Sequence, residues 1–137
     1  MKTLSKLFMA LVLLSAFTCN KDVYPLDNIS LSGNWNMKNV SGGLIGLDLD
    51  YNIGDVIWNF NTNTSQLSVT NNILTNGPKS IYAKFQTGTY SYYIDTLNTS
   101  LELYVDSSSV GLITVGISAL LLDDGVATDG FLTRFEK

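Results

Sequence analysis

The acidic side chains are the residues of this sequence best suited to chemistry, and their placement limits what they can do. The chain contains no histidine, which excludes a histidine-based catalytic triad and a histidine-ligated metal. Two carboxylates can hydrolyse a glycosidic bond when the fold holds them at the right separation. Asp95, Glu102 and Asp106 lie on expected strands, but alternation points them away from the apolar face. We therefore expect a non-catalytic protein without a cofactor.

One acidic segment has part of a calcium-binding pattern. Asp48, Asp50 and Asn52 show the one, three, five spacing of an EF-hand loop. That loop also needs glycine at position six and glutamate at position twelve, where this chain has Ile53 and Asn59. A solvated turn is the better interpretation, and no metal site is expected.

The only cysteine, Cys19, follows a basic start and a short apolar segment. Lys2 and Lys6 precede an apolar run over residues 7–17, which is too short to cross a hydrocarbon layer about 30 Å thick. The arrangement resembles a bacterial lipoprotein signal, in which the cysteine becomes the lipidated first residue of the mature chain. Residues 16–18 depart from the usual lipobox. Ordinary secretion with cleavage near the same point is therefore the alternative.

This resemblance implies three segments and a location. Residues 1–18 would be a signal peptide, residues 19–30 a tether, and residues 31–137 the folded domain. The protein would be lipid-anchored in the bacterial cell envelope, in the outer membrane, with the membrane as its partner. Removing the signal changes the net charge from −4 to −6, because it takes away two lysines and no acid. Because phosphate backbones bind clustered basic residues, so acidic a chain is not expected to bind nucleic acid. The sequence does not specify a protein partner.

After residue 30, alternating apolar and polar residues predict about eight strands and no amphipathic helix. The first strand is expected over residues 33–40, and only residues 44–55 and 73–86 are long enough to hide a helical turn. Hairpin-length turns between short strands predict an all-β, up-and-down antiparallel barrel. A β-sandwich, which needs a long Greek-key connection, is the alternative. The residues expected to face the interior are Val56, Trp58, Phe60, Leu67, Val69, Tyr90, Tyr92, Ile94, Leu101, Leu103, Val105, Ile113, Val115, Ile117, Leu120, Leu122, Phe131 and Phe135.

The head of the first expected strand carries a family motif. Gly33-Asn34-Trp35 is the G-x-W of lipocalins, and with "DVIWNF" and the closing "DGFLTRFEK" residues 31–137 resemble bacterial lipocalin-like lipoprotein domains. In that family the tryptophan plugs the closed end of the barrel and a late arginine stacks across it. The resemblance implies these structural roles for Gly33, Trp35 and Arg134. The chain is shorter than a typical lipocalin and lacks the other loop motifs of the family.

The resemblance also implies a small apolar or amphipathic ligand inside the barrel. The candidate ligand-binding residues are Trp58, Phe60, Tyr90, Tyr92, Phe131 and Phe135. Alternatively these side chains fill the barrel, since eight strands leave room for either arrangement, and the protein is a structural or protein-interaction module. Four apolar residues would lie at the barrel mouth, either as a lid or as part of the core: Leu44, Ile45, Leu47 and Tyr51.

Overall fold

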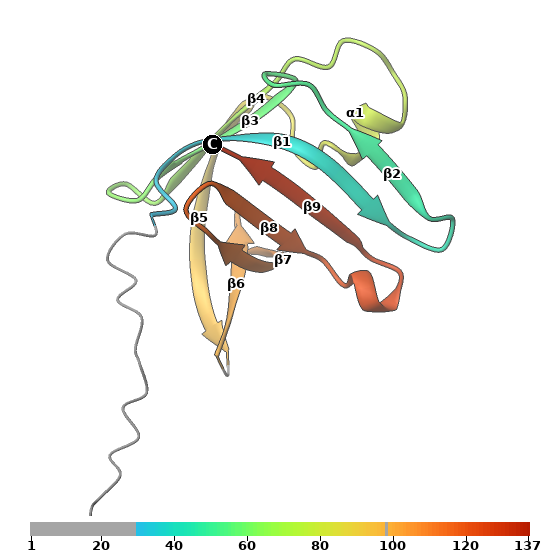
Figure 1. Ribbon diagram of the computed structural model, residues 1–137. Helices are drawn as coiled ribbons and strands as arrows, with labels where there is room; N and C mark the ends of the chain where they lie inside the picture. The colour runs from blue at the N-terminus through green and yellow to red at the C-terminus, as the bar shows by residue number, and fades with distance from the viewer. Residues whose placement is uncertain (1–29, 98) are drawn as a thin grey trace, which may run out of the picture.

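The chain folds into a closed β-barrel with almost no helix (Figure 1). A computed structural model describes residues 30–97 and 99–137. Nine strands occur in this part of the chain: β1 (Gly33–Gly42), β2 (Leu47–Asp50), β3 (Val56–Asn61), β4 (Gln66–Asn71), β5 (Gly88–Leu97), β6 (Ser100–Val105), β7 (Ser108–Val115), β8 (Ala119–Asp123) and β9 (Phe131–Glu136). The connections contain one short helix, α1 (Pro78–Tyr82), and one 3-10 turn, η2 (Val126–Thr128).

Antiparallel pairing follows chain order around the barrel. Each strand from β3 to β8 pairs with the strand that follows it in the chain, and β9 pairs with β1 to close the sheet. On its other edge β1 pairs with β3 over its first half and with β2 over its second half. Eight strand positions therefore surround the barrel. The up-and-down barrel expected from the alternation is confirmed, and the sandwich is excluded.

The strand position next to β1 is divided in two by a turn. The pairing of β1 with β3 ends at the pair Asn36–Ile57, and the pairing of β1 with β2 begins at the pair Asn39–Asp50. Between the two pairs, residues 51–55 leave the ladder and form a turn before the start of β3. Strand β2 therefore continues the line of β3 along the same edge of β1.

Large apolar side chains fill the interior, largely as the alternation predicted. Trp35, Trp58 and Phe135 are fully buried. Two of the residues expected to face inward do not: Ile117 is 77% exposed and Leu101 is 38% exposed. Ile117 lies beyond the end of β7, so strand alternation no longer applies to it. Leu101 lies near the start of β6, where the barrel ends.

The two ends of the barrel differ in how they are covered. Short turns at residues 62–65 and 116–118 lie at the end where β1 begins, which we call the closed end. Longer connections lie at the opposite, open end: residues 72–87 with α1, and residues 124–130 with η2 (Figure 1). This open end is where the chain has material for a site.

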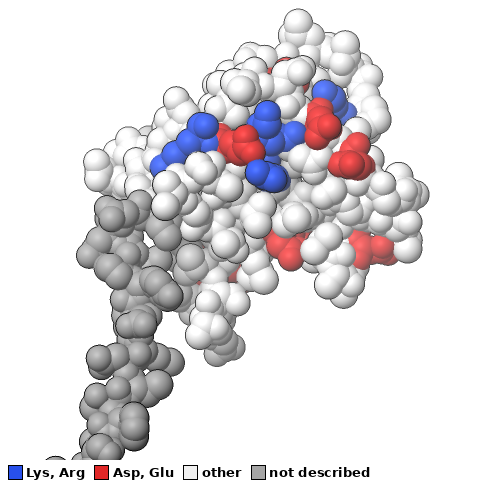
Figure 2. Space-filling view, viewed as in Figure 1, with Lys and Arg blue, Asp and Glu red and all other residues white. Residues whose placement is uncertain are grey.

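The outer surface mixes charges of both signs. On the face shown in Figure 2, Lys and Arg side chains lie among Asp and Glu side chains. Among residues 30–97 and 99–137, no helix is long and apolar enough to span a membrane.

Candidate ligand-binding site

A cleft of about 510 Å³ opens at the open end of the barrel. Three chain segments surround it: the β4–β5 connection, the β6–β7 hairpin and the β8–β9 loop. Its lining combines apolar and polar groups: Lys84, Phe85, Val105, Ser108, Ser109, Val110, Asp124, Gly130 and Phe131. Apolar walls with a few polar groups are the usual composition of a small-molecule site.

Phe85 forms the floor of the cleft on one side. Its ring centroid lies 5.4 Å from that of Trp58 and 5.1 Å from that of Tyr90. The Asn71 side-chain amide donates a hydrogen bond of 3.1 Å to the Phe85 carbonyl, which fixes the backbone there. Phe85 therefore separates the cleft from the buried aromatic residues below it.

An ion pair crosses the mouth of the barrel. The Lys84 ammonium donates to the Asp124 carboxylate, and these side chains are only 18% and 25% exposed. The other oxygen of Asp124 accepts a hydrogen bond from the Phe131 backbone N–H. Because Lys84 precedes β5 and Asp124 follows β8, the pair ties together two connections that are far apart in the chain.

The six aromatic candidates are placed in one connected interior, but only Phe131 lines the cleft. The Trp58 ring lies 4.7 Å from that of Phe135 and 6.1 Å from that of Phe60, measured between centroids. Phe60 in turn meets Tyr92 edge-on at 5.0 Å. These four side chains are buried, whereas Tyr90 is partly buried. A binding role for the six stays a prediction.

Two polar atoms inside the barrel have no hydrogen-bond partner among the described residues. They are Nε1 of Trp58 and Oγ1 of Thr133, and both side chains are fully buried. An unpaired buried donor or hydroxyl costs about 1–3 kcal/mol. The interior is therefore packed with apolar side chains but contains two polar atoms without a hydrogen-bond partner among the described residues.

The residues considered for a lid divide between solvent and core. Leu44 and Ile45, at the tip of the β1–β2 hairpin, are 89% and 82% exposed. Leu47 is partly buried against the core, and Tyr51 is buried with its hydroxyl donating to the Lys79 carbonyl at 3.0 Å. Burial, and secondarily the nearby Asp55 carboxylate, raise the pKa of Tyr51 to about 12.

The covering of the open end comes instead from the segment that contains α1. Tyr82 packs against Phe131 in a tilted arrangement with ring centroids 4.9 Å apart, and Phe85 covers Trp58. Sequence reasoning did not single out Tyr82 or Phe85. The available signal was the apolar content of residues 73–86, one of two long stretches between expected strands.

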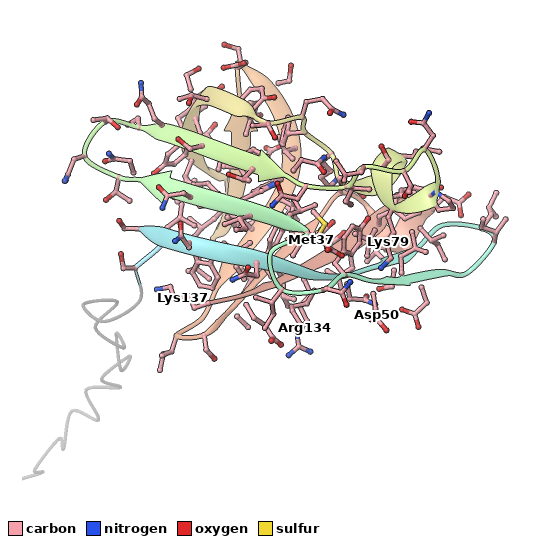
Figure 3. The ribbon with its side chains drawn as sticks, turned by 90° about the horizontal axis from the view of Figure 1, so that it is seen from above. Met37, Asp50, Lys79, Arg134 and Lys137 are labelled. Atoms are coloured by element: carbon pink, nitrogen blue, oxygen red, sulfur yellow. The ribbon has the colours of Figure 1, made fainter. Side chains whose placement is uncertain are left out.

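The closed end contains the G-x-W motif, with one correction. Trp35 Nε1 donates to the Leu31 carbonyl at 2.8 Å, and the ammonium over its ring belongs to Lys137, at 4.7 Å from the centroid. Arg134 is instead exposed and forms an ion pair with Glu136 at 2.8 Å. Figure 3 shows the Arg134 side chain pointing away from the barrel. The arginine role implied by the lipocalin resemblance is therefore wrong for this chain. Arg134 pairs in register with Asn39, farther along β1, whereas Glu136 pairs with Asn36, so Lys137 is the residue that reaches Trp35.

Gly33 is explained by its backbone angle. Its φ is 109°, in the region that favours glycine, and an added Cβ would meet no atom within 4 Å. Entry of the chain into β1 therefore depends on backbone conformation at this position and not on a close approach of neighbours.

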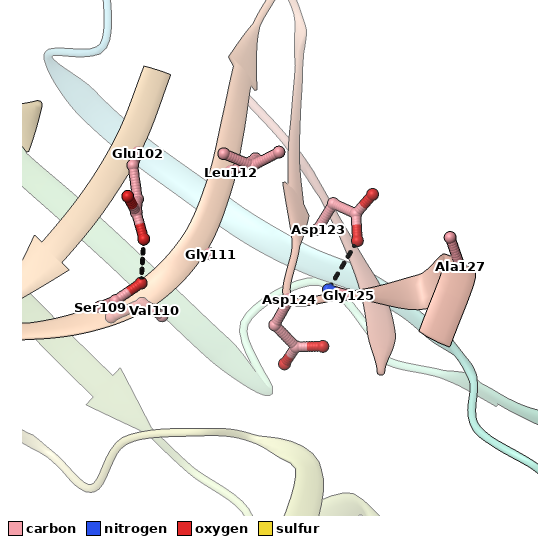
Figure 4. Close-up of a pocket in the computed structure, with 9 residues that line it drawn as sticks. All are labelled: Glu102, Ser109, Val110, Gly111, Leu112, Asp123, Asp124, Gly125 and Ala127. Atoms are coloured by element: carbon pink, nitrogen blue, oxygen red, sulfur yellow. Dashed lines mark hydrogen bonds between the residues drawn. The ribbon is translucent and has the colours of Figure 1, made fainter. Parts of the chain in front are cut away.

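A second depression, of about 470 Å³, lies beside the cleft, and its lining includes Glu102, Asp123 and Asp124 (Figure 4). The Glu102 carboxylate accepts from the Ser109 hydroxyl, and Asp123 accepts from the Gly125 N–H at 2.9 Å. Gly111 has φ of 135°, and a Cβ there would lie 2.4 Å from the Asp123 carbonyl oxygen. Glycine therefore lets β7 and the end of β8 approach closely here.

Three further acids accept structural hydrogen bonds. Asp48 and Asp50 accept from the Asn39 side-chain amide at 2.7 and 3.0 Å, on the outer face of β2. Asp106 accepts from the Ser91 N–H at 2.9 Å. In the part of the chain that the structure describes, no group of three or more Asp, Glu, His or Cys residues is arranged to hold a metal ion.

These features define a class: a closed, eight-stranded, up-and-down antiparallel barrel with a cleft at one end. Comparisons with protein-family models, with curated proteins and with solved structures give no match to this chain. Its function is therefore argued from its own residues.

Proposed function

We propose that the protein is a lipid-anchored, lipocalin-like protein of the bacterial outer membrane that binds a small apolar or amphipathic molecule at the open end of its barrel. The observation that carries the proposal is the cleft of about 510 Å³ against Phe85, Val110 and Phe131. Its volume is within the roughly 300–1,000 Å³ of small-molecule sites. The protein acts by binding, without catalysis and without a cofactor.

The proposed anchor is compatible with access to this cleft. Cys19 lies outside the described residues, so its lipidation is supported by the sequence alone. The described chain enters the barrel at Gly33, at the closed end, opposite the cleft. A tether attached there leaves the mouth unobstructed.

Titration with a fluorescent amphiphile tests the binding proposal. Since Phe85 lines the cleft and contacts Trp58, a bound molecule is expected to change the tryptophan fluorescence with a saturable dependence on concentration. Ser108→Phe places a ring at an exposed position of the cleft lining and is expected to abolish this response. The matched control is Ser68→Phe, at an exposed position on β4 outside the cleft, and it should bind normally.

A second candidate function is favoured by a different observation. The barrel below the cleft is filled, and apolar side chains at the open end are exposed, including Leu44 at 89% and Leu74 at 97%. These features suit a protein-interaction module whose exposed loops bind a partner protein. Absence of a saturable response with any amphiphile in the titration above favours this second function.

A further inference from the structure

Lys84 has more hydrogen-bonding capacity than the protein uses. Its ammonium carries three donor hydrogens, and its hydrogen-bond partner among the described residues is Asp124. The side chain is 18% exposed and lines the cleft, so the remaining donors are available to a molecule bound there. A ligand oxygen placed in the cleft would satisfy them.

The acids around the same mouth are already engaged. Asp124 accepts from Lys84 and from the Phe131 N–H. Asp123 accepts from the backbone N–H groups of Gly125 and Val126, at 2.9 and 2.8 Å. Both oxygens of Asp124 and one oxygen of Asp123 thus serve the fold of the β8–β9 loop. The charged group of the cleft lining with hydrogen-bonding capacity to spare is the Lys84 ammonium.

The charges around the cleft disfavour a charged ligand of either sign. Glu102 accepts from the Ser109 hydroxyl and from the Tyr104 hydroxyl, at 3.2 Å for the latter, and lies beside Asp123 and Asp124. An anion that approaches Lys84 therefore meets an ammonium whose charge is already balanced by the Asp124 carboxylate, with Glu102 and Asp123 on the adjacent depression adding further negative charge. A cation meets the ammonium itself at the point of binding.

From this arrangement, and resting on the proposed function, we infer that the ligand is an uncharged amphiphile with an acceptor oxygen, such as an amide, ester or alcohol. The oxygen accepts a hydrogen bond from the Lys84 ammonium beside Asp124. The apolar chain lies against Phe85, Val110 and Phe131. Selectivity for the neutral head group comes from the repulsion of charged ones as well as from the hydrogen bond.

Isothermal titration calorimetry with three probes of equal chain length tests the inference. Octanamide, octanoate and octylamine differ in head-group charge and share the same apolar tail. We expect octanamide to bind roughly tenfold more tightly than either charged probe, because the Asp124 carboxylate repels octanoate and the Lys84 ammonium repels octylamine.

Three substitutions assign the effect to the ion pair. Lys84→Met should lower octanamide affinity roughly tenfold, because the donor is lost. Asp124→Asn keeps an oxygen for the Phe131 N–H and removes one negative charge, so octanoate should gain roughly tenfold relative to octanamide. Lys79→Met removes a lysine that lies over the Tyr51 ring, outside the cleft, and should change none of the three affinities.

The outcomes separate this inference from the proposed function. Tighter binding of octanoate or octylamine, or unchanged octanamide affinity in a folded Lys84→Met variant, overturns the inference and leaves the proposed function intact. Binding of none of the probes overturns both. Circular dichroism checks the fold; if Lys84→Met is unfolded, Lys84→Leu replaces it and should show the same roughly tenfold loss of octanamide affinity.

Discussion

Lys137 holds its ammonium over the indole of Trp35, with Nζ 4.7 Å from the ring centroid. The same ammonium donates to the Ser30 carbonyl at 3.2 Å. The last residue of the chain thus contacts the first described residue and covers the tryptophan of the first strand. Closure of the barrel between β1 and β9 is what brings the two together.

Substitutions at the closed end should rank according to this contact. Trp35→Ala is expected to lower the free energy of unfolding by about 3–5 kcal/mol, because a fully buried indole is lost. Lys137→Met should cost about 0.5–1 kcal/mol through the lost cation–π contact. Arg134→Met should change stability by less than about 0.5 kcal/mol, since Arg134 is exposed. Urea unfolding measures all three, and a larger loss for Arg134 than for Lys137 would contradict the assignment.

Lipidation of Cys19 should place the protein in the membrane fraction. Cys19→Ser removes the thiol that would carry the lipid, so the variant is expected in the soluble envelope fraction. Ser30→Ala, at the end of the proposed tether, is the control and should stay with the membrane. Fractionation with immunoblotting measures this. A Cys19→Ser variant that remains membrane-bound with unchanged electrophoretic mobility would show that Cys19 is not the anchor.

Thr133→Val should stabilise the barrel. The hydroxyl of Thr133 is buried without a partner in the described chain, and valine has nearly the same shape without the polar group. The expected gain in the free energy of unfolding is about 1 kcal/mol. Thr70→Val, at an exposed position on β4, should change it by less than about 0.5 kcal/mol. A clear loss of stability in Thr133→Val would mean that the hydroxyl has a buried water as its partner.

Tyr51 should make stability fall at alkaline pH. Burial raises its pKa from 10.0 to about 12, so the fold favours the neutral phenol. This contribution is complete below pH 10.0 and is lost as the pH rises towards about 12. Tyr51→Phe should reduce the slope of stability against pH in that range. Part of the slope should remain, because burial also raises the pKa of Tyr92. Urea unfolding of both proteins across that range tests this, and identical slopes would contradict it.

Much of the barrel was predictable from the sequence because strand alternation is a local property. Trp58 and Phe60 lie two residues apart, so any strand that contains them turns both side chains to one face. Their burial needed no knowledge of the rest of the fold. The same rule failed at Ile117, because alternation does not reveal where a strand ends. Thus the sequence by itself determined the fold class and the inward face of most strands.

Only the tertiary structure decided which distant residues meet. Phe85 on Trp58, Lys84 with Asp124 and Lys137 over Trp35 are contacts between segments that no local pattern links. Each depends on the register of the strands and on the path of the connections at the barrel ends. A polar or aromatic residue outside a strand has no alternation to orient it. Its partner is set by the closure of the whole barrel, and for this reason the cleft and the ion pair across its mouth appeared only in the folded chain.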